Sequence, residues 1–215
     1  MNSTSIIITR PNHDLGTHYL CVWTEDVVKL AKTKCKILDL KGEKVTKENF
    51  ESYIEKHHPR FIFINGHGNE LEVTGHENQT LVKVGVNEYI LANKIIYARS
   101  CDAAKTLGAT VAKDHSATFI GYKKSYILGR NPSKALTPLK DEVAKLFIEP
   151  SNLVSISIIK GNTAKEAYLK SQQAMKKNFL FMLSSSATLN QRDAASYLWA
   201  NIRNQVLLGD ENAKL

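Results

Sequence analysis

The chain has 215 residues, of which 43% are hydrophobic, so it can bury a sizeable core in one large domain or at most two small ones. Its net charge of +8 comes from scattered lysines and arginines that form no aromatic-interleaved stripe, so we do not expect direct nucleic-acid binding. No apolar run approaches the ~20 residues that span a bilayer, and the stretch MNSTSIIITRP lacks the basic region and apolar core of a secretory signal. The three cysteines form no C-x-x-C pair, which favours a reduced, cytoplasmic protein without a disulfide framework or zinc knuckle.

The first half of the chain alternates short apolar runs with segments of helical periodicity. Thr24 is a possible N-cap in the first helical segment, and Thr46 begins the second in the same way. Alternating residues with turn formers in their middle predict a hairpin after the third strand. In chain order we predict strand 5–11, helix 17–35, strand 36–42, helix 46–58, strand 60–66, hairpin 69–85 and helix 86–93.

The second half continues the pattern and then becomes mostly helical. Its predicted elements are strand 94–101, helix 102–115, strand 116–122, helices 136–149, 163–182 and 189–204, and strand 205–210. The alternation of strands and helices predicts an α/β fold for residues 1–215, with about six mostly parallel strands covered by helices on both faces. In such folds the chemistry gathers at the carboxyl ends of the strands, where His67 and Cys101 both lie.

Cys101 and His67 are residue types that can act together as nucleophile and base. A thiol attacks only as thiolate, and a neighbouring imidazole can take its proton and later protonate a leaving amine. The helix predicted directly after Cys101 would stabilise a thiolate, and Gly68 would leave its N–H open to an oxyanion. Taken singly, a cysteine at a strand end is usually a small buried hydrophobe, and a His-Gly pair is usually a turn. Their joint position at two successive strand ends favours a functional site.

The same two strand ends carry a resemblance to a known family. FIFINGHGN (61–69), followed by KIIYARSCDAAKTLGATVAKDHSATFIGY (94–122), resembles the caspase–gingipain clan of cysteine peptidases. Within the clan the chain is most similar to the CHAT and gingipain-like branch, because of Ser-Cys at 100–101, FIGY at 119–122 and the ending LLGDENA at 207–213. Glu211 stands where that branch usually has proline, and the Gln-Ala-Cys-x-Gly motif of true caspases is absent.

The resemblance implies a caspase-like three-layer sandwich and a cysteine endopeptidase that needs no metal or organic cofactor. It makes Cys101 the nucleophile, His67 the general acid/base, and the N–H groups of Gly68 and Cys101 the oxyanion hole. It does not require a third carboxylate. The expected partners are a specific protein or peptide substrate and a regulatory protein, in a signalling or defence role. The hairpin at 69–85 is a candidate for gating.

The resemblance leaves the substrate pocket open, because three of its segments suggest different preferences. Asp14 could accept a basic side chain, Arg10 or Lys123 could accept an acidic one, and Tyr122 with Tyr126 could line an apolar pocket. The candidate pocket residues are therefore Arg10, Asp14, Ser100, Tyr122 and Lys123.

Three further histidines lie in loops near the predicted site. His76 falls in the hairpin turn, close enough in sequence to overhang the site, and His13 and His18 follow the first strand, where they could contact substrate. Two other functions remain open at this stage. One is a scaffold or adaptor that keeps the fold without catalysis. The other is a small-molecule or nucleotide-binding doubly wound domain with NGHGNE as an anion-binding turn, although the glycine fingerprint of nucleotide-binding domains is missing.

Overall fold

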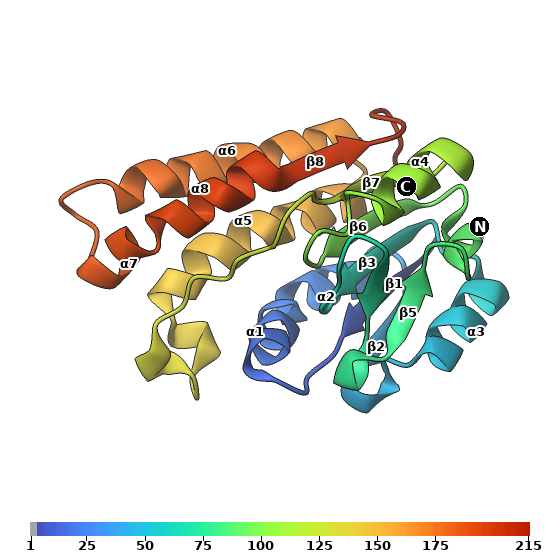
Figure 1. The fold of residues 1–215 in the computed structure, drawn as a ribbon, viewed down its shortest axis with the longest axis horizontal. Helices are drawn as coiled ribbons and strands as arrows, with labels where there is room; N and C mark the ends of the chain where they lie inside the picture. The colour runs from blue at the N-terminus through green and yellow to red at the C-terminus, as the bar shows by residue number, and fades with distance from the viewer. Residues whose placement is uncertain (1–3) are drawn as a thin grey trace.

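Six strands form the central sheet of the computed structural model, which describes residues 4–215, in the order β2-β1-β3-β6-β7-β8 (Figure 1). All neighbouring pairs are parallel except β7 and β8, which are antiparallel. This confirms the predicted six-stranded, mostly parallel sheet and makes β3 and β6 direct neighbours. The strands are β1 (Ser5–Arg10), β2 (Lys36–Lys41), β3 (Phe61–Asn65), β6 (Ile95–Arg99), β7 (Thr118–Tyr122) and β8 (Gln205–Leu208).

Helices cover both faces of the sheet, because alternate strand residues point to opposite sides. Ile7 packs with residues of α3 and α4 in one buried cluster, and Ile6 and Ile8 pack with residues of α2, α5 and α6 in another. The result is a three-layer arrangement, and the long helices α5, α6 and α8 extend past the sheet on one side (Figure 1). The helices are α1 (Leu15–Trp23), α2 (Glu25–Lys32), α3 (Lys47–His57), α4 (Leu107–Asp114), α5 (Glu142–Ile159), α6 (Ala164–Met182), α7 (Leu189–Asp193) and α8 (Ala195–Asn204).

A small hairpin follows β3, as the sequence predicts. It consists of β4 (Glu72–Thr74) and β5 (Thr80–Lys83), which pair antiparallel and are joined by the 3₁₀ turn η2 (His76–Asn78). The N–H of Thr74 donates to the carbonyl of His67, so the hairpin lies directly against the end of β3. The hairpin therefore forms one wall around the carboxyl end of the sheet.

Several helices begin or end elsewhere than the sequence predicts. The segment 17–35 is two helices that meet at Thr24, whose hydroxyl donates to the carbonyl of Leu20 and caps neither helix with its side chain. The segment 189–204 is likewise two helices, α7 and α8. Instead of a helix over 86–93 there is only the 3₁₀ turn η3 (Glu88–Leu91).

The helix predicted over 136–149, with Pro138 near its start, begins later in the structure. Pro138 lies in a separate 3₁₀ turn, η5 (Pro138–Lys140), and α5 begins only after Asp141. The Asp141 carboxylate accepts hydrogen bonds from the N–H groups of Val143 and Ala144, so it is the N-cap. The helix then continues through Pro150 to Ile159, beyond the predicted end.

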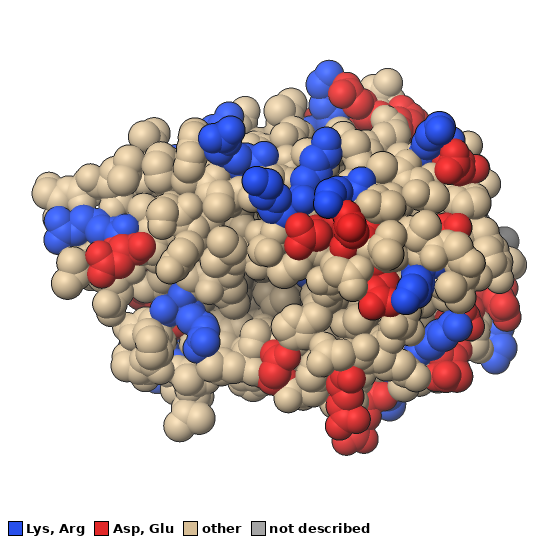
Figure 2. Space-filling model, viewed as in Figure 1, with Lys and Arg blue, Asp and Glu red and all other residues tan. Residues whose placement is uncertain are grey.

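Charged side chains of both signs are interspersed on the face that Figure 2 shows. Among residues 4–215, no helix combines the length and the apolar composition that a membrane crossing requires. The isoelectric point of about 9.3 thus reflects an excess of lysine and arginine spread among acidic groups.

Candidate active site

A cavity of about 90 Å³ opens at the carboxyl edge of the sheet, and His67 and Cys101 both line it. His67 follows β3 and Cys101 follows β6, and the register pairs Asn65 with Arg99 at the ends of these neighbouring strands. The adjacency of the two strands therefore brings together the two residues that sequence reasoning singled out. The cavity is lined by Gly16, Thr17, Leu20, Gly66, His67, Arg99, Ser100, Cys101, Tyr126 and Leu128.

Cys101 is a partly buried free thiol whose Sγ lies 3.8 Å from the carbonyl oxygen of Tyr126, to which it donates. Burial raises the pKa of this thiol above its usual value of 9.0, and the nearby Asp102 carboxylate raises it further. The predicted helix-dipole effect is wrong, because α4 begins only at Leu107 and turns occupy the residues between. Cys101 is therefore a neutral thiol in this unliganded chain.

His67 is half-exposed, and its Nε2 lies 2.5 Å from Oδ2 of Asp14. Asp14 also caps α1, since its Oδ1 accepts from the N–H of Thr17 at 2.8 Å, so the carboxylate is held from both sides. Burial opposes ionisation of Asp14, but the hydrogen bonds from Thr17 and His67 outweigh it and lower the pKa of Asp14 to about 2. Asp14 thus fixes the imidazole, a role that sequence reasoning did not give it.

No hydrogen bond within residues 4–215 joins Cys101 to His67. The thiol donates to Tyr126 and the imidazole pairs with Asp14, so each side chain has its own partner beside the shared cavity. In unliganded enzymes catalytic hydrogen bonds are often long or absent and tighten when substrate binds. The two side chains therefore share the cavity without a direct hydrogen bond between them.

Gly68 lies against the backbone that carries the nucleophile candidate. A side-chain carbon at Gly68 would come within 2.8 Å of the Glu72 carbonyl oxygen and 3.2 Å of Cβ of Ser100. Gly68 pairs with Val73 in a bridge that is flanked by the bonds from Asn69 to Glu72 and from Thr74 to His67. In such a pair the N–H of the residue itself points away from its partner strand.

The N–H groups of Gly68 and Cys101 are the two predicted oxyanion-hole donors. Neither makes a hydrogen bond within the part of the chain that the structure describes. Gly66, on the other side of His67, approaches the hairpin so closely that a side-chain carbon would lie 2.2 Å from the Thr74 carbonyl oxygen. The two glycines around His67 therefore serve close packing on both sides, and the N–H groups of Gly68 and Cys101 remain without a hydrogen bond among the described residues.

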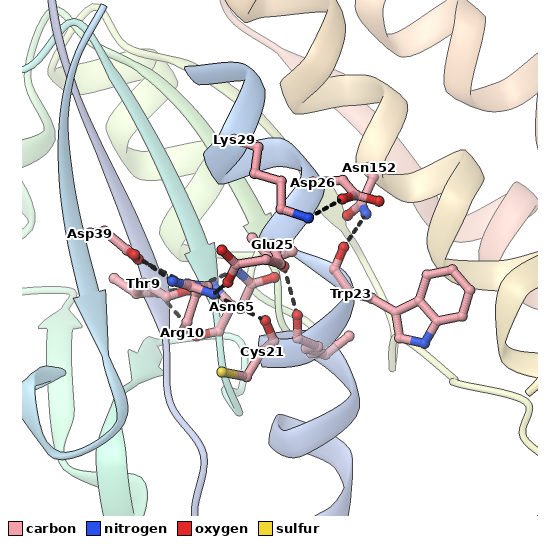
Figure 3. A network of polar contacts seen from close by, with 12 residues as sticks. Thr9, Arg10, Cys21, Trp23, Glu25, Asp26, Lys29, Asp39, Asn65 and Asn152 are labelled. Carbon is pink, nitrogen blue, oxygen red and sulfur yellow. Dashed lines mark hydrogen bonds and ion pairs between the residues drawn. The ribbon is translucent and has the colours of Figure 1, made fainter. Parts of the chain in front are cut away.

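Arg10 does not line the cavity, and its guanidinium binds two carboxylates instead. Figure 3 shows it between the carboxylates of Asp39 on β2 and Glu25 on α2, with Glu25 at 2.7 Å. Its side chain is only 3% exposed, and both carboxylates neutralise its charge. Arg10 is thus placed as a structural ion-pair residue and not as a receptor for an acidic substrate.

Two other candidate pocket residues lie outside the cavity, and one lies in it. Tyr122 is fully buried in the sheet core, where its hydroxyl contacts the hydroxyl of Tyr97 and accepts a hydrogen bond from the side-chain amide of Gln205. Lys123 is exposed and its N–H donates to the carbonyl of Asn204. Ser100 does line the cavity, as does Tyr126, and both bring a buried hydroxyl that makes no hydrogen bond among the described residues.

Arg99 contributes a fully buried guanidinium to the cavity wall. Its N–H groups make five hydrogen bonds, all to neutral acceptors, on Thr24, Asn65, Ser151 and Asn152. Because every donor is in use, Arg99 ties β3, β6, α5 and the α1–α2 junction together behind the cavity. It acts as a structural brace and cannot bind a substrate carboxylate without giving up one of these bonds.

Sequence reasoning missed a histidine cluster on the outer side of His67. The ring of His13 lies 5.9 Å from the ring of His67 and 5.4 Å from that of His76, in edge-on contacts. His13 and Asp14 follow β1, His67 follows β3, and β1 and β3 are neighbours, so the carboxyl-end rule would have found this group. Comparison with protein-family models and with curated protein sequences finds no match for the chain.

Proposed function

We propose that the chain is a cysteine endopeptidase of the caspase-like type, close to the CHAT branch that its strand ends resemble. The observation that carries the proposal is the composition of one cavity edge. It holds a thiol and an imidazole already oriented by a carboxylate, and beside them the N–H groups of Gly68 and Cys101 make no hydrogen bond within residues 4–215. These are the parts that acyl transfer requires.

In the proposed reaction Cys101 attacks the carbonyl carbon of the scissile peptide bond as its proton moves to His67. The tetrahedral oxyanion would accept hydrogen bonds from the N–H groups of Gly68 and Cys101. His67 then protonates the leaving amine, and an acyl-thioester remains on Cys101. Water, deprotonated by His67, hydrolyses the thioester and restores the thiol.

Asp14 would set the tautomer of the base. When Nε2–H of His67 donates to the Asp14 carboxylate, the lone pair on Nδ1 is free to accept the proton of the thiol. The same bond stabilises the imidazolium that forms during the attack. Asp14, which the sequence suggests as a receptor for a basic substrate side chain, would thus be part of the base. The walls formed by Leu20, Tyr126 and Leu128 suit an apolar side chain before the cleaved bond.

A second candidate is a scaffold that keeps this fold and binds a protein partner without catalysis. The raised pKa of Cys101 and the separate hydrogen-bond partners of Cys101 and His67 favour it, because they leave the thiol neutral and unpaired with its base. Both readings agree with a regulated cytoplasmic role and a protein partner, and they differ only in the reactivity of Cys101.

Labelling with a peptidyl acyloxymethyl ketone separates the two candidates. The peptidase predicts rapid labelling of Cys101 over Cys21 and Cys35, slowed about 100-fold or more by His67→Ala, since a general base contributes about 10²–10⁴. His57→Ala is the matched control, because His57 lies at the opposite edge of the sheet, where its carbonyl accepts from Ser5. Slow labelling that His67→Ala leaves unchanged supports the scaffold.

A further inference from the structure

His13 is a largely buried histidine whose two ring nitrogens have no hydrogen-bond partner among the described residues. Its side chain is 11% exposed, and neither Nδ1 nor Nε2 makes a hydrogen bond within residues 4–215. Buried polar groups are nearly always satisfied, so such an imidazole calls for a water molecule or an ion as its partner. Nδ1 of the neighbouring His76 is buried and without a hydrogen bond in the same way.

The groups around His13 are the ligands that a divalent transition metal prefers. One ligand atom each from His13, Asp14 and His67 lies within 4.8 Å of the others. Nε2 of His13 is 3.5 Å and Nε2 of His67 is 2.5 Å from Oδ2 of Asp14. Two imidazoles and one carboxylate, with a position open to water, are a common ligand set for zinc.

The two distances to Asp14 suit a metal after a small side-chain adjustment, and the ligand atoms of His13 and His67, which lie within 4.8 Å of each other, would move closer together. Ligand bonds of 2.0–2.1 Å to tetrahedral zinc set the ligand atoms about 3.3 Å apart. The separation of His13 from Asp14 is already close to this, and that of His67 from Asp14 would have to open by about 0.8 Å. The backbone of the site is well held, since the N–H of His13 donates to Thr17 and Asp14 caps α1.

We propose that His13, Asp14 and His67 form a binding site for a divalent transition metal such as Zn²⁺, which switches off the base of the proposed peptidase. The switching part rests on the proposed function, and the binding part does not. A metal on Nε2 of His67 takes the basic lone pair of the ring and displaces the Asp14 hydrogen bond. Nδ1 then keeps its proton and cannot accept that of Cys101, so the metal-bound form is inactive.

Titration of the full chain with Co²⁺ alone tests the binding part. We expect one Co²⁺ per chain, with the visible d–d absorption of a four-coordinate site, and displacement by Zn²⁺. Cys101→Ser should bind equally well, because the thiol is not a ligand. His13→Gln and Asp14→Asn should weaken binding by more than about 10-fold, the loss that even an outer partner of a ligand causes. His57→Gln is the matched control and should bind as the parent chain does.

Thermal unfolding followed by circular dichroism is the control that the variants are folded. We expect Asp14→Asn to fold because asparagine still caps α1. Absence of stoichiometric Co²⁺ binding, or binding that His13→Gln leaves unchanged, overturns the inference.

Labelling of Cys101 by the peptidyl ketone, with and without Zn²⁺, tests the switch. For the parent chain and for each variant, the labelling rate with Zn²⁺ is divided by the rate without it, and these ratios are compared. Zn²⁺ should slow labelling in the parent chain by about 10-fold or more when saturating, and His13→Gln should abolish most of this effect. Zn²⁺ inhibition that persists in His13→Gln would place the metal on the thiol instead and contradict the proposal.

The two failures are distinguishable. If Co²⁺ binds but Cys101 is never labelled, the metal site stands and the peptidase fails. If Cys101 is labelled in a His67-dependent way and Co²⁺ does not bind, the peptidase stands and the metal site fails.

Discussion

Nε2 of His67 lies 2.5 Å from Oδ2 of Asp14, and the same carboxylate holds the N-terminus of α1 through Oδ1. One side chain therefore fixes both the direction of a helix that lines the cavity and the orientation of the imidazole inside it. Asp14 is therefore a positioning residue, and replacing it with asparagine or with alanine should have different consequences.

Asp14→Asn should lower the rate of Cys101 labelling by the peptidyl ketone about 10- to 100-fold, less than the loss of the base itself. Asparagine remains a good N-cap but loses the charge interaction that lowers the pKa of Asp14, so Asp14→Asn should lower the free energy of unfolding by less than Asp14→Ala, which also loses the cap at about 1 kcal/mol. Urea unfolding and labelling rates measure the two effects. An unchanged labelling rate in folded Asp14→Asn would mean that the carboxylate matters to the fold alone.

Much of this arrangement follows from the sequence, because apolar runs and their ends are local signals. The runs Phe61–Asn65 and Ile95–Arg99 predict neighbouring parallel strands, and that is enough to bring His67 and Cys101 to one cavity. The helical periodicity after Cys101 misleads, since Ala103 and Ala104 are fully buried as turn residues and Asp102 has a φ of +57°. Helix propensity is a weak preference that tertiary packing overrides here.

The sequence pattern alone does not predict the partners of the charged residues. Arg10 reads as surface charge at a strand end, yet its partners are Glu25 on a helix and Asp39 on the neighbouring strand. Only the order of the strands shows that two carboxylates converge on it. The same holds for Asp14, whose partner His67 is distant in the chain but adjacent once β1 and β3 pair.

The pH dependence of Cys101 alkylation should report the state of the resting thiol. Since burial raises the pKa of Cys101 above 9.0, the thiolate fraction is small at neutral pH and grows as the pH rises past 9. The rate of iodoacetamide alkylation, measured without peptide, should therefore rise throughout this range. Cys101→Ser identifies the contribution of the other thiols, of which Cys21 is only 1% exposed. A rate that is already maximal at pH 7 would show that Cys101 and His67 form an ion pair without substrate.

Arg99→Lys should destabilise the chain even though it keeps the positive charge. The five N–H bonds of Arg99 go to four acceptor atoms, and a lysine has only three donors, so at least one buried acceptor loses its partner. Each unsatisfied buried group costs about 1–3 kcal/mol, which predicts a loss of about 1 kcal/mol or more in urea unfolding. Arg60→Lys is the matched control, because Arg60 is exposed, and it should change stability by less than about 0.5 kcal/mol. Equal stability of the two variants would contradict the brace role of Arg99.

The cavity walls predict which side chain precedes the cleaved bond. Leu20 and Leu128 are apolar, Arg10 is neutralised elsewhere, and every N–H of Arg99 is in use, so a charged side chain would meet no free opposite charge among these residues. Burying an unpaired charge costs far more than an apolar contact gains.

Peptidyl ketones with leucine at this position should therefore label Cys101 about 10-fold or more faster than those with aspartate or lysine. Leu128→Ala enlarges the cavity and should shift the preference towards phenylalanine, whereas an equivalent change at the exposed Leu136 should not. Fastest labelling by the aspartyl ketone would instead mean that Arg99 gives up some of its five hydrogen bonds to bind the carboxylate of the substrate. In that case Arg99→Lys should abolish the aspartate preference and leave labelling by the leucyl ketone, per folded chain, nearly unchanged.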